Sequence, residues 1–298
     1  MAIQFAAAIL PSKRKLIQIG ISVYRNQCVS HFIRCVNSCL EQEGANFFIE
    51  IRADGDIPKE IKQYIENALA HHNNISFKQG KEHLGTFGSY REIFSKSNSE
   101  YLCQLDADDY LAPGALESCM KAFNYDPFLS FVYTDCINID EKGSPLGIDS
   151  HSLTPYSKKE LLISFMTFHF RLVSRYKYNL VCGYDGEFRY AGDYDLCLKL
   201  SEVGNVTHIY RPLYYYRLHP NSASQKHQDL VYLESLAASQ RALIRRGLDE
   251  SSRISLLSNG SLILEEKNNS RSPIESSIKE QSREITDDIF YISPIEMH

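Results

Sequence analysis

The residues that most constrain this chain are 101–110, an apolar run that ends in three aspartates. The run has the length and composition of a buried strand, and Asp106, Asp108 and Asp109 follow where that strand stops. Carboxylates this close repel one another, and a hard divalent cation such as Mg²⁺ or Mn²⁺ relieves the repulsion by binding their oxygens. The stretch therefore predicts a metal site at a strand end, with coordination positions left for phosphate oxygens.

Three other interpretations use the same acidic cluster. One aspartate could serve only as a cap for the helix that Pro113 introduces. A calcium loop of the EF-hand type needs glycine at its sixth position, but Leu111 stands sixth from Asp106. A phosphohydrolase with an aspartyl nucleophile needs a small β-branched residue where Tyr110 stands, and it remains the weaker alternative.

Composition narrows the class of protein. A chain of 298 residues that is 43% hydrophobic and 11% aromatic supplies a substantial core for one large or two modest domains. The formal charge of −5 disfavours nucleic acid as a partner. Eight cysteines without a Cys-x-x-Cys pair indicate reduced core thiols in a cytoplasmic protein and argue against structural zinc. The apolar first ten residues are too short to span a bilayer and lack a preceding basic segment, so we expect no signal peptide or transmembrane helix.

Strand and helix patterns alternate along the first half of the chain. Strands are predicted at 16–24, 47–52, 75–77, 101–105 and 129–133, and helices at 29–40, 59–70 and 115–123. This alternation is typical of an α/β fold, a Rossmann-like, mostly parallel sheet flanked by helices on both faces. Ligands bind such sheets at the carboxyl ends of the strands. Tyr24, Asp54 and Asp106–Asp109 stand at predicted strand ends, so a single crevice can collect them.

The second half has a different character. A hairpin turn is predicted at 138–143, a helix at 158–166, an extended segment at 168–173 and a tyrosine-rich strand at 207–216. Another helix is predicted from about residue 193, because Leu196, Cys197 and Leu200 share one helical face. Asp193 and Asp195 stand at its start, where capping and the helix dipole alone favour acids.

The last part of the chain divides into a helix and a polar segment. A helix is predicted at 229–247, with Arg241, Arg245 and Arg246 on a solvated face; peripheral contact with an anionic membrane is the weaker alternative. From Asp249 onward the composition predicts a polar tail or linker. The expected organisation is thus an N-terminal extension at 1–16, a folded domain at 17–248 and a tail at 249–298.

Five ordered motifs resemble those of the family 2 glycosyltransferases, which have the GT-A fold. They are Ile-Ser-Val-Tyr-Arg-Asn at 21–26, Ala-Asp-Gly-Asp at 53–56, Asp-Ala-Asp-Asp at 106–109, Gly-Asp-Tyr-Asp-Leu at 192–196 and Arg-Leu-His at 217–219. A lone Asp-x-Asp is weak, but five motifs in the family's order and spacing are specific. The resemblance implies a nucleotide-binding half with an acceptor-side extension and a C-terminal helix.

The resemblance also implies which residues bind the nucleotide of the donor. Tyr24 corresponds to a residue that stacks on the base, and Asp54 to a contact with the base, with uracil favoured. Arg91 corresponds to an arginine near the nucleotide, although the interval from Arg91 to Asp106 is one residue shorter than the common pattern. Arg217 corresponds to a contact with the diphosphate.

The metal site is implied in the same way. Asp108 corresponds to a metal ligand, Asp106 lies near the ribose or the metal, and His219 is an additional metal or diphosphate contact. The implied cofactor is Mn²⁺ or Mg²⁺, which neutralises charge on the departing diphosphate.

The resemblance finally implies the chemistry. Asp193 corresponds to the catalytic base that deprotonates an acceptor hydroxyl, and Gly192 replaces the usual glutamate before it. His169 corresponds to an acceptor contact. We therefore expect an inverting transferase that moves a sugar from a nucleotide-diphosphate sugar to a saccharide or lipid-linked acceptor in polysaccharide assembly. The alternative of another class is a non-catalytic donor-binding domain, which would not need the base.

Overall fold

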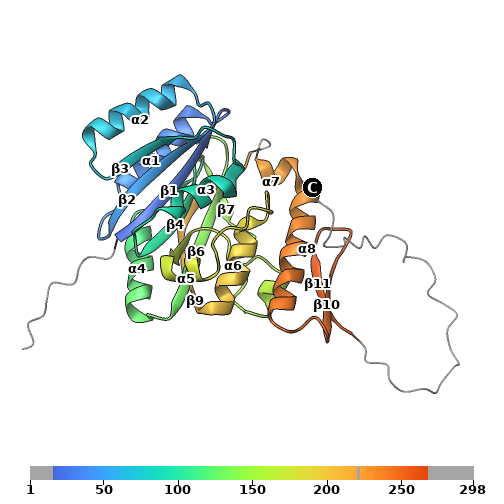
Figure 1. The fold of residues 1–298 in the computed structure, drawn as a ribbon. Coiled ribbons are helices and arrows are strands. Elements are labelled where there is room, and N and C mark those ends of the chain that lie inside the picture. Colours follow the sequence, from blue (N-terminus) through green and yellow to red (C-terminus); the bar gives the residue numbers. More distant parts are fainter. Residues whose placement is uncertain (1–15, 220–221, 268–298) are drawn as a thin grey trace, which may run out of the picture. The chain divides into compact units, whose positions relative to one another are not determined.

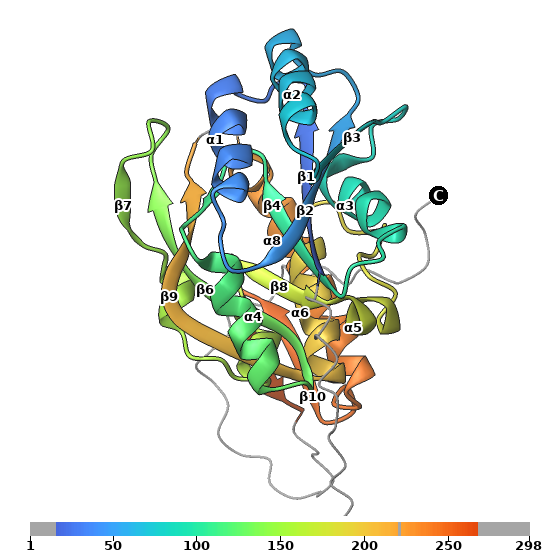
Figure 2. The same cartoon turned by 90° about the vertical axis from the view of Figure 1, so that its left-hand side faces the viewer.

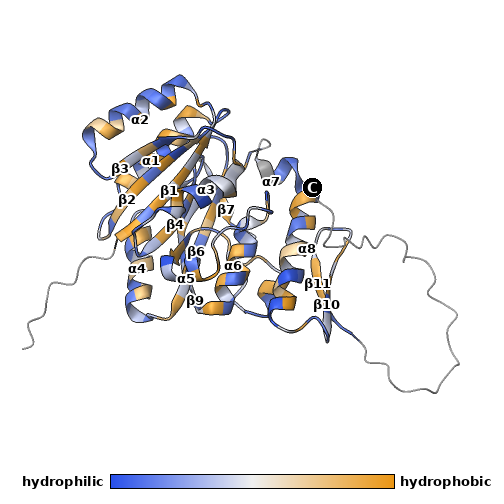
Figure 3. Ribbon diagram, viewed as in Figure 1, coloured by the Kyte–Doolittle hydropathy of each residue, from blue (hydrophilic) through white to orange (hydrophobic). Residues whose placement is uncertain are grey.

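The first half of the chain forms a parallel sheet in the computed structural model, which describes residues 16–219 and 222–267 (Figure 1). Its strands lie in the order β3 (Ile75–Gln79), β2 (Asn46–Asp54), β1 (Leu16–Tyr24) and β4 (Tyr101–Asp106). The central strands are predominantly apolar along their length (Figure 3), because both faces of the sheet are covered. The predicted α/β fold is confirmed.

Helices pack on the two faces of this sheet. Alternate residues of β4 join different apolar clusters: Cys103 and Leu105 lie in one, Leu102 in the other. The first cluster includes α1 (Val29–Leu40), α2 (Lys59–His71) and α4 (Ala115–Tyr125), and the second includes α3 (Gly85–Ser95). Figure 2 shows α1 and α3 on opposite sides of β1 and β2. Helix α3 was not predicted, because Gly85 and Gly88 lower its helix propensity.

The second half continues the sheet but mixes strand directions. The order from β4 onward is β8 (Arg171–Ser174), β6 (Leu129–Ile139), β9 (Asn205–Arg217) and β5 (Tyr110–Leu111), and β7 (Pro145–Ile148) pairs with β6. β8 is antiparallel to both β4 and β6, whereas β9 is parallel to β6. The prediction of a mostly parallel sheet therefore holds for the first half alone.

The helix predicted at 158–166 is wrong. Apart from η2 (Glu160–Leu162), a single 3₁₀ turn, and η1 (Ser150–Leu153) before it, this region is irregular. Leu161, Leu162 and Met166 are buried there, so their apolar spacing reflects packing of a loop and imitates a helical pattern.

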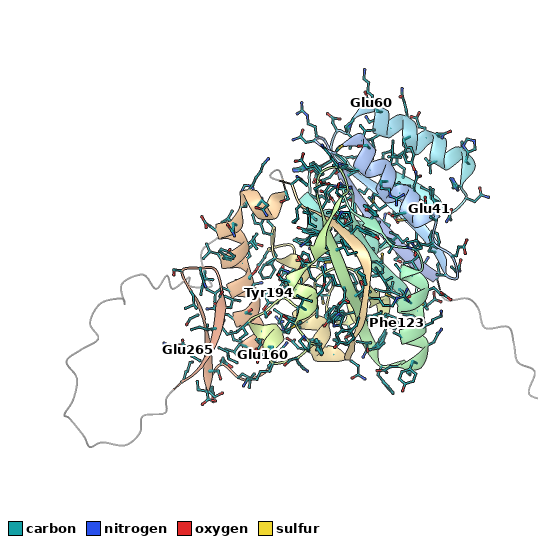
Figure 4. The ribbon with its side chains drawn as sticks, turned by 180° about the vertical axis from the view of Figure 1, so that it is seen from behind. Glu41, Glu60, Phe123, Glu160, Tyr194 and Glu265 are labelled. Carbon is teal, nitrogen blue, oxygen red and sulfur yellow. The ribbon has the colours of Figure 1, made fainter. Side chains whose placement is uncertain are left out.

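The C-terminal part packs around two long helices. α6 (Gly192–Val203) follows the short α5 (Arg175–Leu180), and α7 (Ala223–Lys226) leads into α8 (Gln228–Arg245). The hydroxyl of Tyr194, labelled in Figure 4, donates to the carbonyl of Leu161 at 2.7 Å and lies 3.0 Å from the Ser239 hydroxyl. Tyr194 thus joins α6 to α8 through buried polar contacts.

Part of the predicted polar tail is folded. Residues 252–266 form an antiparallel hairpin of β10 (Ser252–Leu256) and β11 (Leu262–Glu266) beside α8. Ile254 and Leu262 are buried in one apolar cluster with Ala238 and Ala242 of α8. The folded unit therefore extends to Lys267 and does not stop at 248, because these few apolar residues suffice to dock the hairpin. The rest of the predicted tail and the predicted extension at 1–15 lie outside the described residues.

The cysteines are free thiols, six of them buried. Cys28 and Cys182 are exposed, so the expectation that all eight lie in the core is wrong for these two. Both stand at the boundary of a helix, where the chain approaches the surface.

Candidate active site

Asp106 stands at the centre of the strand ends. Its Oδ1 accepts hydrogen bonds from the Tyr90 hydroxyl at 3.0 Å and from the Gln104 amide at 2.9 Å. Burial, followed by the neighbouring charges of Asp108 and Asp193, raises the pKa of Asp106 to about 6. Asp108 and Asp193 are distant in sequence, and their shared effect on one carboxyl indicates that all three lie at one site.

Asp108 and His219 form a contact across the site. The Nε2 atom of His219 lies 2.8 Å from Oδ2 of Asp108, although 110 residues separate the two along the chain. The hydrogen bond to Asp108 raises the pKa of His219 above 6.5. The structure thus brings together the two residues predicted as metal ligands.

Asp109, the third aspartate of the motif, has a structural role. Asp109 is 1% exposed, and its carboxylate accepts from the Arg217 backbone N–H and from the Tyr214 hydroxyl, both at 2.7 Å. Burial, together with the charges of Asp108 and Asp106, raises its pKa. Asp109 therefore fastens the loop after β4 to the end of β9.

Asp193 lies in the first turn of α6, beside a buried arginine. Its Oδ2 is 3.0 Å from Nη2 of Arg171, and its Oδ1 accepts from the Tyr194 backbone N–H at 2.9 Å. Arg171 is 7% exposed and is itself held by the carbonyls of Thr167 and Phe168. A guanidinium fixed in this way holds the carboxylate in one orientation.

The loop before Asp193 is anchored from α8. The carboxylate of Glu234 accepts hydrogen bonds from the backbone N–H groups of Arg189, Tyr190 and Ala191, at 2.7 to 3.1 Å. Gly192 is required by packing, since a Cβ there would lie 2.6 Å from the Phe87 ring of α3. The close approach of α3 explains why glutamate does not fit at 192.

Tyr24 and His169 flank the carboxylates. Tyr24 ends β1 and is 39% exposed, and its pKa is raised by burial and then by the charges of Asp108 and Asp106, which places its hydroxyl near both. His169 is 5% exposed, with Nε2 4.0 Å from Oδ2 of Asp106. Its ring stacks on Tyr214, so most of the surface that an acceptor could touch is already covered.

The burial of His169 predicts an acid-sensitive fold. Desolvation holds the pKa of His169 well below 6.5, with Arg171 and His151 adding to the effect. The ring is neutral in the folded state and binds a proton below pH 6.5 when unfolded, so this group makes stability fall as pH drops, by up to about 1.4 kcal/mol per unit. In His169→Gln we expect a flatter dependence of the unfolding free energy on pH between about 5 and 6.5.

Urea unfolding at a series of pH values measures this dependence. His72→Gln, which removes an exposed histidine, is the control and should keep the wild-type slope. Equal slopes in His169→Gln and the wild type would contradict a buried, neutral His169.

Asp54 is engaged within the protein. Its carboxylate is 4% exposed and pairs with Nη1 of Arg52 at 2.7 Å. It also accepts from the backbone N–H groups of Leu84 and Gly85, where α3 begins, and lies 2.6 Å from His83 Nδ1. Asp54 stands at the predicted strand end, but its oxygens cap α3 here, so contact with a base requires one of these partners, such as the exposed His83, to move.

Arg91 is not brought to the other predicted site residues. It is exposed on α3, and its Nη1 lies against Gly186, 3.0 Å from where a Cβ would stand. The preceding residue, Tyr90, reaches Asp106 and the Leu105 carbonyl instead. The interval from Arg91 to Asp106, one residue shorter than the common pattern, indicated this outcome in the sequence. A shift of one residue along a helix moves a side chain to another face, so Tyr90 and not Arg91 points towards Asp106.

The arginines of α8 do not form a free cationic surface. Arg241 pairs with Asp185 and Glu187, and Arg245 and Arg246 both contact Glu202. The predicted solvated face is therefore a set of ion pairs to the loop before α6 and to α6 itself, which removes the basis for membrane contact there. No helix within residues 16–219 and 222–267 has the length and apolar character needed to cross a membrane.

Comparisons with known proteins agree with this arrangement. Residues 19–181 match the family model described as Glycosyl transferase family 2. Chondroitin synthase of Escherichia coli is 30% identical over 233 residues, 78% of this chain and 33% of that protein. Hyaluronan synthase of Pasteurella multocida is 30% identical over the same length, 78% of this chain and 24% of that protein. The chain thus spans about a quarter to a third of the length of these two relatives.

Solved structures show the same fold. S. aureus TarS 1–349, solved in complex with UDP-GlcNAc, superposes with a TM-score of 0.62 at 12% identity, covering 76% of this chain and 66% of that one. At this identity the similarity concerns the fold. The mixed sheet and its flanking helices are therefore shared with a GT-A-like structure.

Proposed function

This chain belongs to glycosyl transferase family 2, and on that premise we propose that it is an inverting, metal-dependent transferase that moves a sugar from a UDP-sugar to a saccharide hydroxyl. Family membership confirms the resemblance, and the matched residues 19–181 contain the first three of the five motifs. The observation that carries the proposal is the convergence of Asp108, His219 and Asp193 around Asp106.

The donor set of the site suits a divalent cation. Asp108 and His219 would hold it: the carboxylate suits either Mg²⁺ or Mn²⁺, and the imidazole nitrogen suits Mn²⁺ better than Mg²⁺. Within the part of the chain that the structure describes, no three His, Cys, Asp or Glu side chains gather as a complete metal cage. The remaining ligands would come from diphosphate oxygens and water. When bound, such an ion stabilises negative charge on the leaving nucleoside diphosphate.

Asp193 supplies the proton acceptor. In the proposed reaction an acceptor hydroxyl oxygen bonds to the anomeric carbon while the bond from that carbon to the diphosphate breaks, and the hydroxyl proton passes to Asp193. Attack from the side opposite the leaving group inverts the anomeric centre. Arg171 holds one oxygen of Asp193 and keeps the carboxylate oriented. Tyr24, exposed at the end of β1, offers an aromatic face for the base of the donor.

The substrate class follows from the named relatives. Two of the relatives, each matched over 78% of this chain, are a chondroitin synthase and a hyaluronan synthase, so we favour a saccharide chain as the acceptor. UDP is the favoured nucleotide because the matched TarS structure holds UDP-GlcNAc.

Calorimetric titration of the purified chain with UDP, GDP, ADP and CDP, with and without Mn²⁺, tests the donor site. We expect UDP to bind only when metal is present, because the carboxylates at the strand ends repel an unaccompanied diphosphate. Release of UDP from UDP-sugars in the presence of saccharide acceptors then tests transfer. A sample that is folded by circular dichroism but binds no nucleotide would refute the proposal.

A further inference from the structure

A pocket lies between the start of α1 and the end of β9. Its volume is about 330 Å³, and it is bounded by the first turns of α1, by β5 and by the turn between β6 and β7. The side chains that matter for its chemistry are Ser30, His31, Arg34, Glu141, Lys142 and Arg217. A pocket of this size is at the lower end of the range for small-molecule sites.

The pocket carries an excess of positive charge. Arg34, Lys142 and Arg217 are cationic, and Glu141 is the single carboxylate in the lining. His31 remains neutral near pH 7, since burial and the Arg217 charge lower its pKa below 6.5. The lining itself therefore has a net charge of about +2, and Glu41, outside the lining, lies 3.9 Å from Arg34.

Of these three cations, Arg217 is the one whose burial costs the most free energy. It is 4% exposed, and its guanidinium donates to the carbonyls of Asp108, Asp140 and Glu141 at 2.8 to 3.0 Å. Within the described residues the Arg217 guanidinium forms no ion pair with a carboxylate, and its hydrogen bonds go to neutral backbone carbonyls. A buried cation in this state is stabilised by any anion that reaches it.

The walls of the pocket are built without a ligand. The guanidinium of Arg34 lies 4.8 Å above the Tyr110 ring, which stacks on Tyr215 at 4.4 Å. Nε2 of His31 lies 2.9 Å from the Glu141 carbonyl and ties the β6–β7 turn to α1. These contacts position Arg34 and the β6–β7 turn before any anion arrives.

The start of α1 opens beside the same pocket. Its first turn contains no acidic residue, and the side chain of Cys28, the N-cap, makes no capping hydrogen bond. Backbone N–H groups at such a helix start favour negative charge.

We propose that this pocket binds a phosphate group at a site separate from the donor diphosphate. The charge excess matches a dianion, and two guanidinium groups suit a tetrahedral oxyanion. Because Arg217 is bonded to the carbonyl of Asp108 and faces this pocket, the structure assigns it here in place of its predicted contact with the donor diphosphate. The phosphate is either free in solution or the headgroup of a phospholipid, and the volume leaves room for an ester substituent.

Titration of the metal-free chain with inorganic phosphate in EDTA tests the pocket alone, because the donor site requires metal. We expect phosphate to bind the wild type and to bind Arg34→Gln/Lys142→Gln at least about tenfold more weakly. Lys59→Gln/Lys96→Gln removes the same charge at exposed positions elsewhere and is the control, with expected affinity equal to wild type. Circular dichroism confirms that each variant is folded.

The alkylation rate of Cys28 locates the bound anion. The Cys28 thiol lies 3.3 Å from the Ser30 hydroxyl of the pocket, and its pKa is lowered by hydrogen bonds from Ser30 and His31 and, least, by the Arg217 charge. Phosphate should therefore slow its reaction with iodoacetamide and leave exposed Cys182 unaffected. Equal slowing at Cys182 would refute binding at this pocket.

Vesicles distinguish the two sources of phosphate. Retention on phosphatidylcholine vesicles that contain phosphatidic acid, lost in Arg34→Gln/Lys142→Gln, identifies a lipid headgroup; binding of inorganic phosphate alone identifies a soluble anion. If the wild type binds neither inorganic phosphate nor the phosphatidic acid vesicles, the proposal is overturned. It is also overturned if the double variant loses UDP–Mn²⁺ binding to the same extent as phosphate binding, because the pocket would then belong to the donor site. The UDP titration of the wild type tests the transferase proposal independently.

Discussion

Replacing Asp193 with asparagine is expected to lower kcat by roughly 10²–10⁴ and to leave UDP binding nearly unchanged. The amide keeps the size of the side chain but cannot accept the hydroxyl proton. Because Asp193 lies in the first turn of α6 and its partner Arg171 is buried, the substitution also leaves a buried guanidinium without its carboxylate. Initial rates of UDP release, divided by the folded enzyme concentration, measure the effect on catalysis.

Asp195→Asn is the matched control on the same helix. Asp195 is buried and pairs with Lys199 at 2.8 Å, so its loss should lower the melting temperature. We expect its turnover to stay within about tenfold of the wild type, because Asp195 faces Lys199 and not Asp106. Turnover at the wild-type level in Asp193→Asn would remove Asp193 from the reaction.

Replacing Asp108 with asparagine is expected to weaken Mn²⁺ binding by at least about 100-fold and to abolish metal-dependent UDP binding. The substitution removes one of the two proposed metal ligands and also the hydrogen-bond partner of His219. Calorimetric titration with Mn²⁺, followed by UDP at saturating metal, measures both effects.

A second Asp–His pair supplies the control for Asp108. Oδ1 of Asp149 lies 2.7 Å from Nδ1 of His151, so Asp149→Asn breaks a comparable contact outside the metal pair. We expect this variant to bind Mn²⁺ and UDP as the wild type does. A normal Mn²⁺ titration in Asp108→Asn would show that the ion, if bound, is held elsewhere.

The strand ends could be predicted from sequence because they are local patterns. An apolar run followed by acids identifies the end of β4, and short motifs identify Asp108, Asp193 and His219. Parallel strands bring their carboxyl ends to one edge, so the convergence on Asp106 follows from the order of elements.

The supporting contacts could not be predicted, because they join residues far apart in the chain. Arg171 and Asp193 are 22 residues apart, and Glu234 reaches the loop before α6 from 43 to 45 residues away. Asp54 illustrates the same limit: its position at a strand end is local, but its use as a cap depends on where α3 starts. The hairpin after 251 was missed because its few apolar residues matter only through α8.

The buried carboxylate of Asp109 limits how donor specificity can be exchanged between relatives. Asp109 accepts hydrogen bonds from the backbone N–H of Arg217 and the hydroxyl of Tyr214, which are more than a hundred residues away in the chain. The loop after β4 and the end of β9 are therefore held together. A chimaera that replaces residues 16–112 alone would separate Asp109 from partners selected to fit it. An exchange of residues 16–112 between relatives would therefore have to include residues 214–219 as well if the chimaera is to remain functional.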